Sequence, residues 1–416
     1  MVSETIELRG HIIDSLILPK VLDQILTRGA SFKITEIKIG QNRADQSFAR
    51  IEVSAGSSDA LNELTLRLRQ HGAEVVERAD AKVASAPDDG VFPDNFYVTT
   101  NQQTFVRIGG KEIEVQPAMM DSGIVLDAKK GIARAVKFPE VKRGDQVVVG
   151  HKGIRVAPVQ RSTSQADLFQ FINATVGANE PKSAIIREIA DELQQAKSSG
   201  GSIAAVAGKA VVLTGAGKYL QKLIELGFVQ RFFTGNAFAV NDVERALFGT
   251  SRGLSAASPL PGTSHENHLR AINVLRSLGG IRPAVEKNVL TSGIMYACVR
   301  NNVDIILTGS IRDDGPIPGV TTDVVEAQKI MREKLAGVTH VLLLGTVQHS
   351  LAVASMLSPN VKTICVDINP ATVDLIVDQQ PFQSIGLVTD VEPFLRELCE
   401  AIDDATGSPK KRGGAK

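Results

Sequence analysis

The segment GSIRDDGPIPG at positions 309–319 sets an arginine and two adjacent aspartates among glycines and prolines. It follows VDIILT, an apolar run that predicts a buried strand, so the three charges lie where that strand leaves a sheet. A guanidinium can bind a carboxylate through two hydrogen bonds, and a carboxylate can hold an ammonium group or accept its proton. Arg312, Asp313 and Asp314 are therefore candidates to bind a zwitterionic amino acid. The alternative is an exposed capped turn.

Other segments near predicted strand ends also carry small and polar residues. In open parallel sheets, ligands bind beyond the carboxyl ends of the strands. Glycine and serine backbones can approach a pyrophosphate, helix N-termini favour its charge, and an acidic side chain can hold a ribose diol. Taken together, these segments favour a dinucleotide site over a bare scaffold. They are TGAGKYL, TGNA, LTSGIMY, GTVQHS, CVDINP and VTDV.

Two of the local signals are weak on their own. Gly215 and Gly217 in TGAGKYL lack the third glycine of the dinucleotide fingerprint, so a tight strand-to-helix turn is an equal alternative to cofactor binding. His265 and His268 in HENH lie three residues apart, and no third ligand follows at metal spacing. We therefore expect a solvated helix start at HENH, and we predict no metal site.

The elements that must position these residues fall into three regions and a tail. Residues 1–84 alternate as strand, helix, strand, strand, helix and strand, which is typical of a ferredoxin-like or ACT-like domain. Residues 85–160 hold short strands between glycine and aspartate turns and predict a small, barrel-like β unit. In residues 161–405, a helical linker precedes apolar strands that alternate with amphipathic helices. That pattern predicts an α/β fold with a Rossmann-like, doubly wound parallel sheet. The polar tail 406–416 is expected to be disordered.

Individual strands can be predicted as well. The last strand of the first region is predicted across AEVVERADAKVA, after a helix in SSDALNELTLRLRQHG. The predicted strands of the parallel sheet are KAVVLTG, QRFFTGN, VDIILTGS, THVLLLGT, VKTICVDI and SIGLVTD.

Composition excludes several classes of protein. Lys+Arg and Asp+Glu number 46 each, so there is no global charge that would favour nucleic acid or an anionic membrane as a partner. No secretory signal and no apolar run of membrane-spanning length are visible. The three cysteines form no even framework, and Cys298 and Cys365 lie in apolar runs, where cysteine acts as a small apolar residue. A cytoplasmic protein is expected.

Several motifs together resemble the archaeal-type ornithine cyclodeaminases of the LOR/SDH conserved-region family. The same module forms the C-terminal part of cyanobacterial bifunctional arginine dihydrolase/ornithine cyclodeaminases. The resemblance spans about residues 1–405. It rests on GVFPDNFYVTTN, TGNAFAVND, RALFGTS, LTSGIMY, GSIRDDGPIPGV, TTDVVEAQ and CVDINP. The family's Rossmann-like domain is similar to that of deoxyhypusine synthase, which would explain the missing third glycine.

The resemblance implies an NAD-dependent lyase that converts L-ornithine to L-proline and ammonia. NAD would take a hydride from the α-carbon, the δ-amine would attack the imine, ammonia would leave, and the hydride would return. By this likeness the cofactor contacts are Asn236, Ala237, Thr291, Ser292, Gly293, Asp367, Asn369, Asp390 and Val391, with Asn273, Thr346 and His349 as weaker candidates. Arg312, Asp313 and Asp314 would handle the substrate, under a lid that includes Asp94, Asn95 and Tyr97.

Some alternatives stay open at this stage. An NAD-linked amino acid dehydrogenase and an NAD-binding, amino-acid-sensing regulatory protein fit the same motifs. Asp367 favours NAD over NADP, and a homo-oligomer, either a dimer or a tetramer, is expected. The segment DSG at 121–123 departs from the DCG that the resemblance leads us to expect, so Ser122 would put activity in doubt if a thiol is needed there.

Overall fold

The computed structural model divides the chain into two compact units, and each unit is considered by itself. The first comprises Met1–Asp167 and Ser355–Pro359, and the second comprises Leu168–Ala354 and Asn360–Lys416. The predicted disordered tail and most of the predicted helical linker lie outside the described residues. The structure describes residues 2–10, 12–13, 17–40, 45, 47–57, 60–61, 64–65, 67–68, 72–75, 79–100, 102–127, 130–157, 175–176, 182–251, 254–255, 264–379 and 384–405.

The first unit begins with a four-stranded antiparallel sheet in the order β2-β3-β1-β4. Every second residue of β3 is buried, which is the pattern of a sheet with one covered face. The described residues between 60 and 68 are helical, and the rest of the predicted second helix lies outside the described part. The strand and helix order predicted for this region is confirmed up to β4. The elements are β1 (Val2–Gly10), α1 (Ile17–Thr27), β2 (Ser31–Lys38), β3 (Ser47–Ala55) and β4 (Glu74–Val75).

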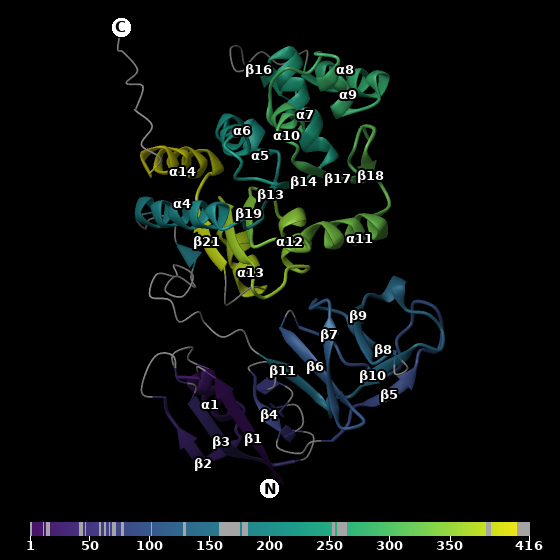
Figure 1. The fold of residues 1–416 in the computed structure, drawn as a ribbon, viewed down its shortest axis with the longest axis vertical. Coiled ribbons are helices and arrows are strands. Elements are labelled where there is room, and N and C mark those ends of the chain that lie inside the picture. The colour runs from purple at the N-terminus through teal and green to yellow at the C-terminus, as the bar shows by residue number, and fades with distance from the viewer. Residues whose placement is uncertain are drawn as a thin grey trace. The chain divides into compact units, whose positions relative to one another are not determined.

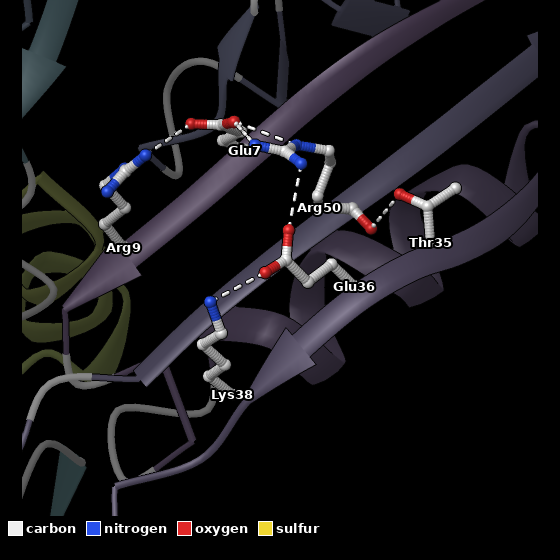
Figure 2. A network of polar contacts seen from close by, with 6 residues as sticks. All are labelled: Glu7, Arg9, Thr35, Glu36, Lys38 and Arg50. Atoms are coloured by element: carbon white, nitrogen blue, oxygen red, sulfur yellow. Dashed lines mark hydrogen bonds and ion pairs between the residues drawn. The ribbon is translucent and has the colours of Figure 1, made fainter.

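The other face of this sheet carries a network of charged side chains, which Figure 2 shows. Arg50 of β3 pairs with Glu7 of β1 at 2.6 Å and with Glu36 of β2 at 2.9 Å. Burial alone would raise the pKa of Glu7, but hydrogen bonds from Arg9 and Arg50 outweigh it and lower that pKa. The network ties three neighbouring strands together on the open face of the sheet.

The second sheet of this unit has seven strands in the order β11-β6-β7-β9-β8-β10-β5. The first and last strands of this order lie close together. The amide of Ala81, just before the edge strand β5, donates to the carbonyl of Arg107 on β6, which lies next to the other edge strand. This is the expected barrel-like arrangement. The strands are β5 (Lys82–Ser85), β6 (Gln103–Ile108), β7 (Lys111–Gln116), β8 (Gly123–Asp127), β9 (Ile132–Val136), β10 (Gln146–Val149) and β11 (Ile154–Ala157), with the short helix η1 (Phe138–Glu140) between β9 and β10.

One predicted strand of the first region is wrong as a single element. The run AEVVERADAKVA contains two strands, β4 and β5, which belong to different sheets. β4 pairs with β1, whereas β5 pairs with β10 in the barrel-like sheet. Periodicity along the chain cannot show this, since a strand's partner is chosen by contacts distant in sequence.

The second unit is built on an eight-stranded parallel sheet in the order β12-β21-β20-β19-β13-β14-β17-β18. Without the short edge strands β12 and β18, the six remaining strands can be numbered 1 to 6 in chain order, from β13 to β21. Read from β17 to β21, their order in the sheet is 3-2-1-4-5-6, which is the order of dinucleotide-binding sheets, and it reverses between β13 and β19. The strands are β12 (Thr175–Val176), β13 (Ile203–Ala207), β14 (Arg231–Gly235), β17 (Asp304–Thr308), β18 (Val320–Thr321), β19 (His340–Leu344), β20 (Lys362–Asp367) and β21 (Ser384–Val388), with a separate hairpin of β15 (Thr250–Ser251) and β16 (Leu254–Ser255).

Helices cover both faces of this sheet, as Figure 1 shows, with α4, α6 and α14 on one side and α11, α12 and α13 on the other. Every residue of β13, β19 and β21 is buried, which explains why these strands are continuous apolar runs. The helices are α4 (Ser183–Ser198), α5 (Ala210–Leu213), α6 (Gly217–Glu225), α7 (Asn236–Phe248), α8 (Ser264–Leu278), α9 (Ile281–Glu286), α10 (Ile294–Arg300), α11 (Val324–Leu335), α12 (Gln348–Ala354), α13 (Pro370–Gln379) and α14 (Val391–Ala405).

The predicted strand KAVVLTG is wrong, and the other predicted strands of the sheet are confirmed. Its apolar residues form the short helix α5, and the preceding run, Ile203–Ala207, is the strand β13. Both runs are apolar and buried, so periodicity does not distinguish them. The chain leaves the sheet at Gly208, where a Cβ atom would lie 2.1 Å from the carbonyl oxygen of Gly345.

None of the helices in the described part of the chain has the length and apolar character needed to cross a membrane. Cys298, Cys365 and Cys399 are all buried.

Candidate functional site

The carboxyl edge of the parallel sheet is lined by glycine where the strand order reverses. A Cβ atom at Gly208, after β13, would also lie 2.7 Å from the Cβ of Thr346. At Gly345, after β19, a Cβ atom would lie 3.3 Å from Val391 at the start of α14. Only glycine therefore lets these strand ends pack so closely. Dinucleotide-binding sheets bind the pyrophosphate at such a reversal, where backbone amides donate to it.

Acidic and amide side chains stand at the ends of β20 and β21. Asp367 is buried, and its Oδ1 accepts a hydrogen bond of 2.8 Å from the amide of Asn369. The Oδ1 of Asn369 accepts from the amide of Ala371, and that of Asp390 accepts from the amide of Glu392. These oxygens satisfy free amides at the starts of α13 and α14, and an acid is favoured there by the helix dipole. The turns are thus held in place by the same residues that the sequence nominated for the cofactor.

The TSG turn before α10 is fixed by an aspartate that sequence reasoning missed. Asp242 on α7 is buried and accepts hydrogen bonds from the amides of Ile294, at 3.0 Å, and Met295, at 2.8 Å. Burial raises the pKa of Asp242 to about 6, although both hydrogen bonds oppose the shift. Thr291 and Ser292 remain exposed next to this support. In the sequence, the signal that could have pointed to this role was an aspartate at the end of the mostly apolar run NAFAVND.

The charged loop 309–319 is held to the sheet at several points. The amide of Ser310 donates to Oδ2 of Asp313 at 2.8 Å, which closes the first turn of the loop. The side chain of Asn236, at the start of α7, accepts from the amide of Ile317 at 3.0 Å and donates to the carbonyl of Gly315. Asn236 therefore joins the candidate cofactor edge to the candidate substrate loop, although its side-chain amide is used within the protein.

His349 lies on α12 at the same edge and joins that helix to β17. Its Nε2 is 2.8 Å from the hydroxyl of Thr308, the last residue of β17. Burial lowers the pKa of His349, and the nearby charge of Asp313 opposes that shift. The structure thus brings His349 close to the charged loop, while Arg312 extends an exposed side chain from the same loop.

The expectation of a solvated helix start at HENH is wrong for His268. Its ring is buried, with Nδ1 3.3 Å from the Oε2 of Glu244 and Nε2 3.7 Å from the Oδ2 of Asp314. Glu244 is fully buried and also accepts a hydrogen bond from Thr250. No group of three acidic, histidine or cysteine side chains with the geometry of a metal site occurs among the described residues. Both partners of His268 are distant in sequence, so spacing alone could not reveal them.

The remaining candidates of the second unit lie on helices or in the turn just before one. Gly217 begins α6, where a Cβ atom would lie 3.4 Å from Ile294, and Gly215 has a positive φ of 85° in the preceding turn. Both follow a helix and not a strand, because KAVVLTG is helical. Asn273 is exposed on α8, and Ala237 is half-buried after Asn236.

The lid candidates belong to the first unit. Tyr97 is buried in the core of the barrel-like sheet, where its ring lies 5.5 Å from that of His151. Asn95 has a positive φ of 60°, and its carbonyl accepts from the amide of Gly150. Ser122 is also buried, and its amide donates to the hydroxyl of Thr99. Ser122 is thus part of a buried turn. Substrate contact by Asn95 and Tyr97 stays a prediction.

Three family models match consecutive parts of the chain. The LOR/SDH bifunctional enzyme conserved region matches residues 3–102. The first C-terminal region of ArgZ-like arginine dihydrolases matches 103–186, and their C-terminal Rossmann-fold region matches 187–398.

Relatives match over nearly the whole chain. A Methanocaldococcus jannaschii protein named ornithine cyclodeaminase is 46% identical over 410 residues, which cover 97% of each chain. The crystal structure of apo ArgZ, an arginine dihydrolase from the ornithine–ammonia cycle in cyanobacteria, matches with a TM-score of 0.83 at 35% identity and covers 97% of this chain. The ternary complex of AgrE with ornithine and NAD+ matches with a TM-score of 0.53 at 36% identity, again over 97% of this chain. The present chain spans 59% of the ArgZ and AgrE chains.

Proposed function

The chain belongs to the ArgZ-like C-terminal family, together with the archaeal proteins named ornithine cyclodeaminase, and we propose that it catalyses the reaction of that name. It is an NAD-dependent ornithine cyclodeaminase, which converts L-ornithine to L-proline and ammonia. The observation that carries the proposal is the joining of two features by Asn236. A glycine-lined reversal point suits a dinucleotide, and the same carboxyl edge of the sheet carries a loop with one cation and two acids, held by Asn236.

The residues at the strand ends fit NAD as the cofactor. Glycine is required at 208 and 345 because a Cβ atom would meet neighbouring protein atoms, and the backbone amides of these turns would hold a pyrophosphate. Asp367 would hold a ribose hydroxyl pair, and Asp242 would act indirectly by keeping Thr291 and Ser292 in place. Bound NAD supplies the reversible uptake of a hydride, so the complete reaction is redox-neutral.

The loop 309–319 would bind the amino acid. Arg312 is exposed and would bind the substrate carboxylate through its paired N–H groups. Asp313 shapes the loop through the amide of Ser310, and we assign Asp314, whose side chain is 45% exposed, as the acceptor for a proton from the substrate ammonium. The amine must lose that proton before the α-carbon can give up a hydride, and ammonia must leave later. One acceptor near the ammonium can serve both steps.

Further proposals concern the organisation of the protein. We place the first domain boundary before β5, because that strand pairs with β10, and a second boundary near residue 160. A lid from the β unit, a lyase role in proline formation, a dimer or tetramer, and a cytoplasmic location remain predictions from the sequence.

Incubation of the pure protein with L-ornithine and a trace of NAD tests the function. Proline and ammonia should form in equal amounts over many turnovers per NAD, with no net NADH. NADH that rises in step with product would replace the proposal with an amino acid dehydrogenase. Tight NAD binding that an amino acid shifts, without any product, would identify a sensor.

A further inference from the structure

The imidazole of His349 reaches across the carboxyl edge of the parallel sheet to the ends of two strands. His349 is the second residue of α12, which follows β19. Its Nε2 lies 2.8 Å from the hydroxyl of Thr308, the last residue of β17. Since β13 and β14 separate β19 from β17 in the sheet, the ring crosses the reversal point to the half that carries the charged loop.

The chain leaves room for this ring at Gly235, the last residue of β14. A Cβ atom at position 235 would lie 3.1 Å from Cε1 and 3.3 Å from Nε2 of His349. Gly235 has a φ of −94°, which every L-residue adopts, so its backbone does not require glycine. The missing side chain at 235 therefore serves the placement of the imidazole against the ends of β14 and β17.

The two ring nitrogens of His349 have different surroundings. Nε2 contacts Thr308, whereas Nδ1 has no hydrogen-bond partner among the described residues and is not enclosed by protein atoms. Burial lowers the pKa of His349, so the ring is neutral at neutral pH, and the opposing charge of Asp313 stabilises it once it is protonated. A neutral imidazole with one nitrogen held and the other accessible can accept a proton.

The reaction proposed above needs a second proton acceptor. Ornithine carries two ammonium groups, and Asp314 takes the proton of the α-ammonium. The δ-nitrogen can attack the α-carbon only as a neutral amine, so the δ-ammonium must lose a proton as well. Hydride loss leaves a positively charged iminium at the α-carbon, and this like charge favours loss of the second proton.

We propose that His349 is a catalytic residue that accepts the proton of the substrate δ-ammonium through Nδ1, while Thr308 accepts a hydrogen bond from its Nε2–H. The proposal rests on the ornithine cyclodeaminase function above. The neutral δ-amine bonds to the α-carbon, a proton passes from it to the α-amino group, and the bond between the α-carbon and that group breaks.

The protons and electrons balance in this sequence. The released ammonia takes the proton held by Asp314. After the hydride returns to the α-carbon, the ring nitrogen of proline takes the proton held by His349. Since the same electron pair leaves and returns, no further oxidant or reductant is required.

The first test separates hydride removal from ring closure. His349→Gln cannot accept the proton, so proline formation from L-ornithine should fall by about 10²–10⁴-fold. Hydride removal should continue, so NADH absorbance should rise towards one NADH per active site, whereas the wild type shows no net NADH. Asp314→Asn is the contrast, because it acts before hydride removal and should accumulate no NADH. Loss of proline without NADH accumulation in His349→Gln overturns the proposal.

The same variant excludes a role in cofactor binding. The Kd for NAD of His349→Gln should stay within about twofold of the wild type, and a Kd raised by more than about tenfold would identify a cofactor contact and overturn the proposal. His340→Gln is the matched control, since His340 is also buried but begins β19 at the opposite end of the strands, where it contacts Glu192. NADH accumulation in His340→Gln as well would overturn the assignment to His349.

A double-mutant cycle uses the close contact at Gly235. Gly235→Ala should displace the ring and lower kcat by about tenfold in the wild type, and it should cost nothing further in His349→Ala, which has no ring. An equal loss in both backgrounds overturns the proposal, because the added methyl group would then act independently of His349. A wild type that makes no proline rejects the proposed function together with this inference. Proline formation by the wild type without NADH accumulation in His349→Gln rejects the inference alone.

Discussion

Two buried histidine–glutamate pairs occupy opposite ends of the same parallel sheet. At the amino end, Glu192 of α4 contacts His340 and also Lys362, at 3.1 Å and 2.6 Å. At the carboxyl end, Glu244 contacts His268, whose other side faces Asp314. The first group has one acid and a permanent cation, so its charges are balanced inside the protein. The second joins His268 to two acids, and the side chain of Asp314 is 45% exposed.

We infer from this difference that the first group contributes to stability and the second to the reaction. The hydrogen bond from His340, with help from Lys362 and against burial, lowers the pKa of Glu192 to about 2. Glu192 therefore stays ionised across the neutral pH range, and its contacts hold α4 on the sheet. In the second group, Asp314 reaches the accessible side of the candidate substrate loop, where we propose that it takes a proton from the substrate ammonium. The same residue types thus have different roles because their third partner differs.

The largest expected effect comes from Asp314, the proposed proton acceptor. Asp314→Asn should lower kcat for ornithine by about 10²–10⁴-fold, because an amide cannot accept the proton. Steady-state assays with proline detection measure this loss, and the Kd for NAD should remain unchanged. Asp304→Asn is the control, since Asp304 begins β17 at the far end and pairs with Lys334. Normal kcat in Asp314→Asn would remove this residue from the mechanism.

The balanced group should affect stability and not catalysis. Glu192→Gln should cost at most about 3 kcal/mol in the free energy of unfolding at neutral pH. Because the folded pKa is lowered, the wild-type advantage is complete above the ordinary pKa of 4.5 and is lost as pH falls towards 2. Urea unfolding of both proteins at several pH values measures the difference. Glu188→Gln, an exposed position on the same helix, should show no such pH dependence.

A third buried acid sharpens the comparison because neither histidine nor lysine contacts it in the described residues. Burial raises the pKa of Asp242 to about 6 from its ordinary 3.8, so wild-type stability falls as pH rises between these values. Relative to Asp242→Asn, the wild type should therefore lose at most about 2–3 kcal/mol across this range. The sign is opposite to that of Glu192→Gln.

Asp242→Asn should also weaken NAD binding by about tenfold, because one of its two amide contacts to the TSG turn is lost. Calorimetric titration with NAD at pH 8 measures the affinity. Glu286→Gln on the exposed side of α9 serves as the control. A stability difference that does not change between pH 4 and 6 would contradict the role given to the buried carboxyl.

The smallest effect is expected at the half-buried charges on the open sheet face of the first unit. Arg50→Gln should lower the melting temperature only slightly, since ion pairs that solvent reaches are weakened by water and by salt. The loss should shrink further between 50 mM and 1 M salt as screening increases. Thermal unfolding followed by circular dichroism tests this, with Lys38→Gln as a neighbouring control. A large loss that persists in high salt would place Arg50 with the buried groups.

The apolar pattern was sufficient for most of the parallel sheet. The runs that become β14, β17, β19, β20 and β21 could be predicted because helices cover both faces, so nearly every residue must be apolar. The same rule failed at KAVVLTG, because a short buried helix is equally apolar. It failed again at AEVVERADAKVA, where one run supplies strands to two sheets.

The sequence by itself determined the alternation of strands and helices and the local turns of GSIRDDGPIPG and CVDINP, which depend on neighbouring residues. Only the tertiary structure decided which charges meet. Asp242 reaches the TSG turn from another helix, and His268 meets Glu244 and Asp314 from two other elements. The physical reason is that the charge state of a side chain is set by burial and by partners within a few ångströms, and folding brings those partners together from distant parts of the chain.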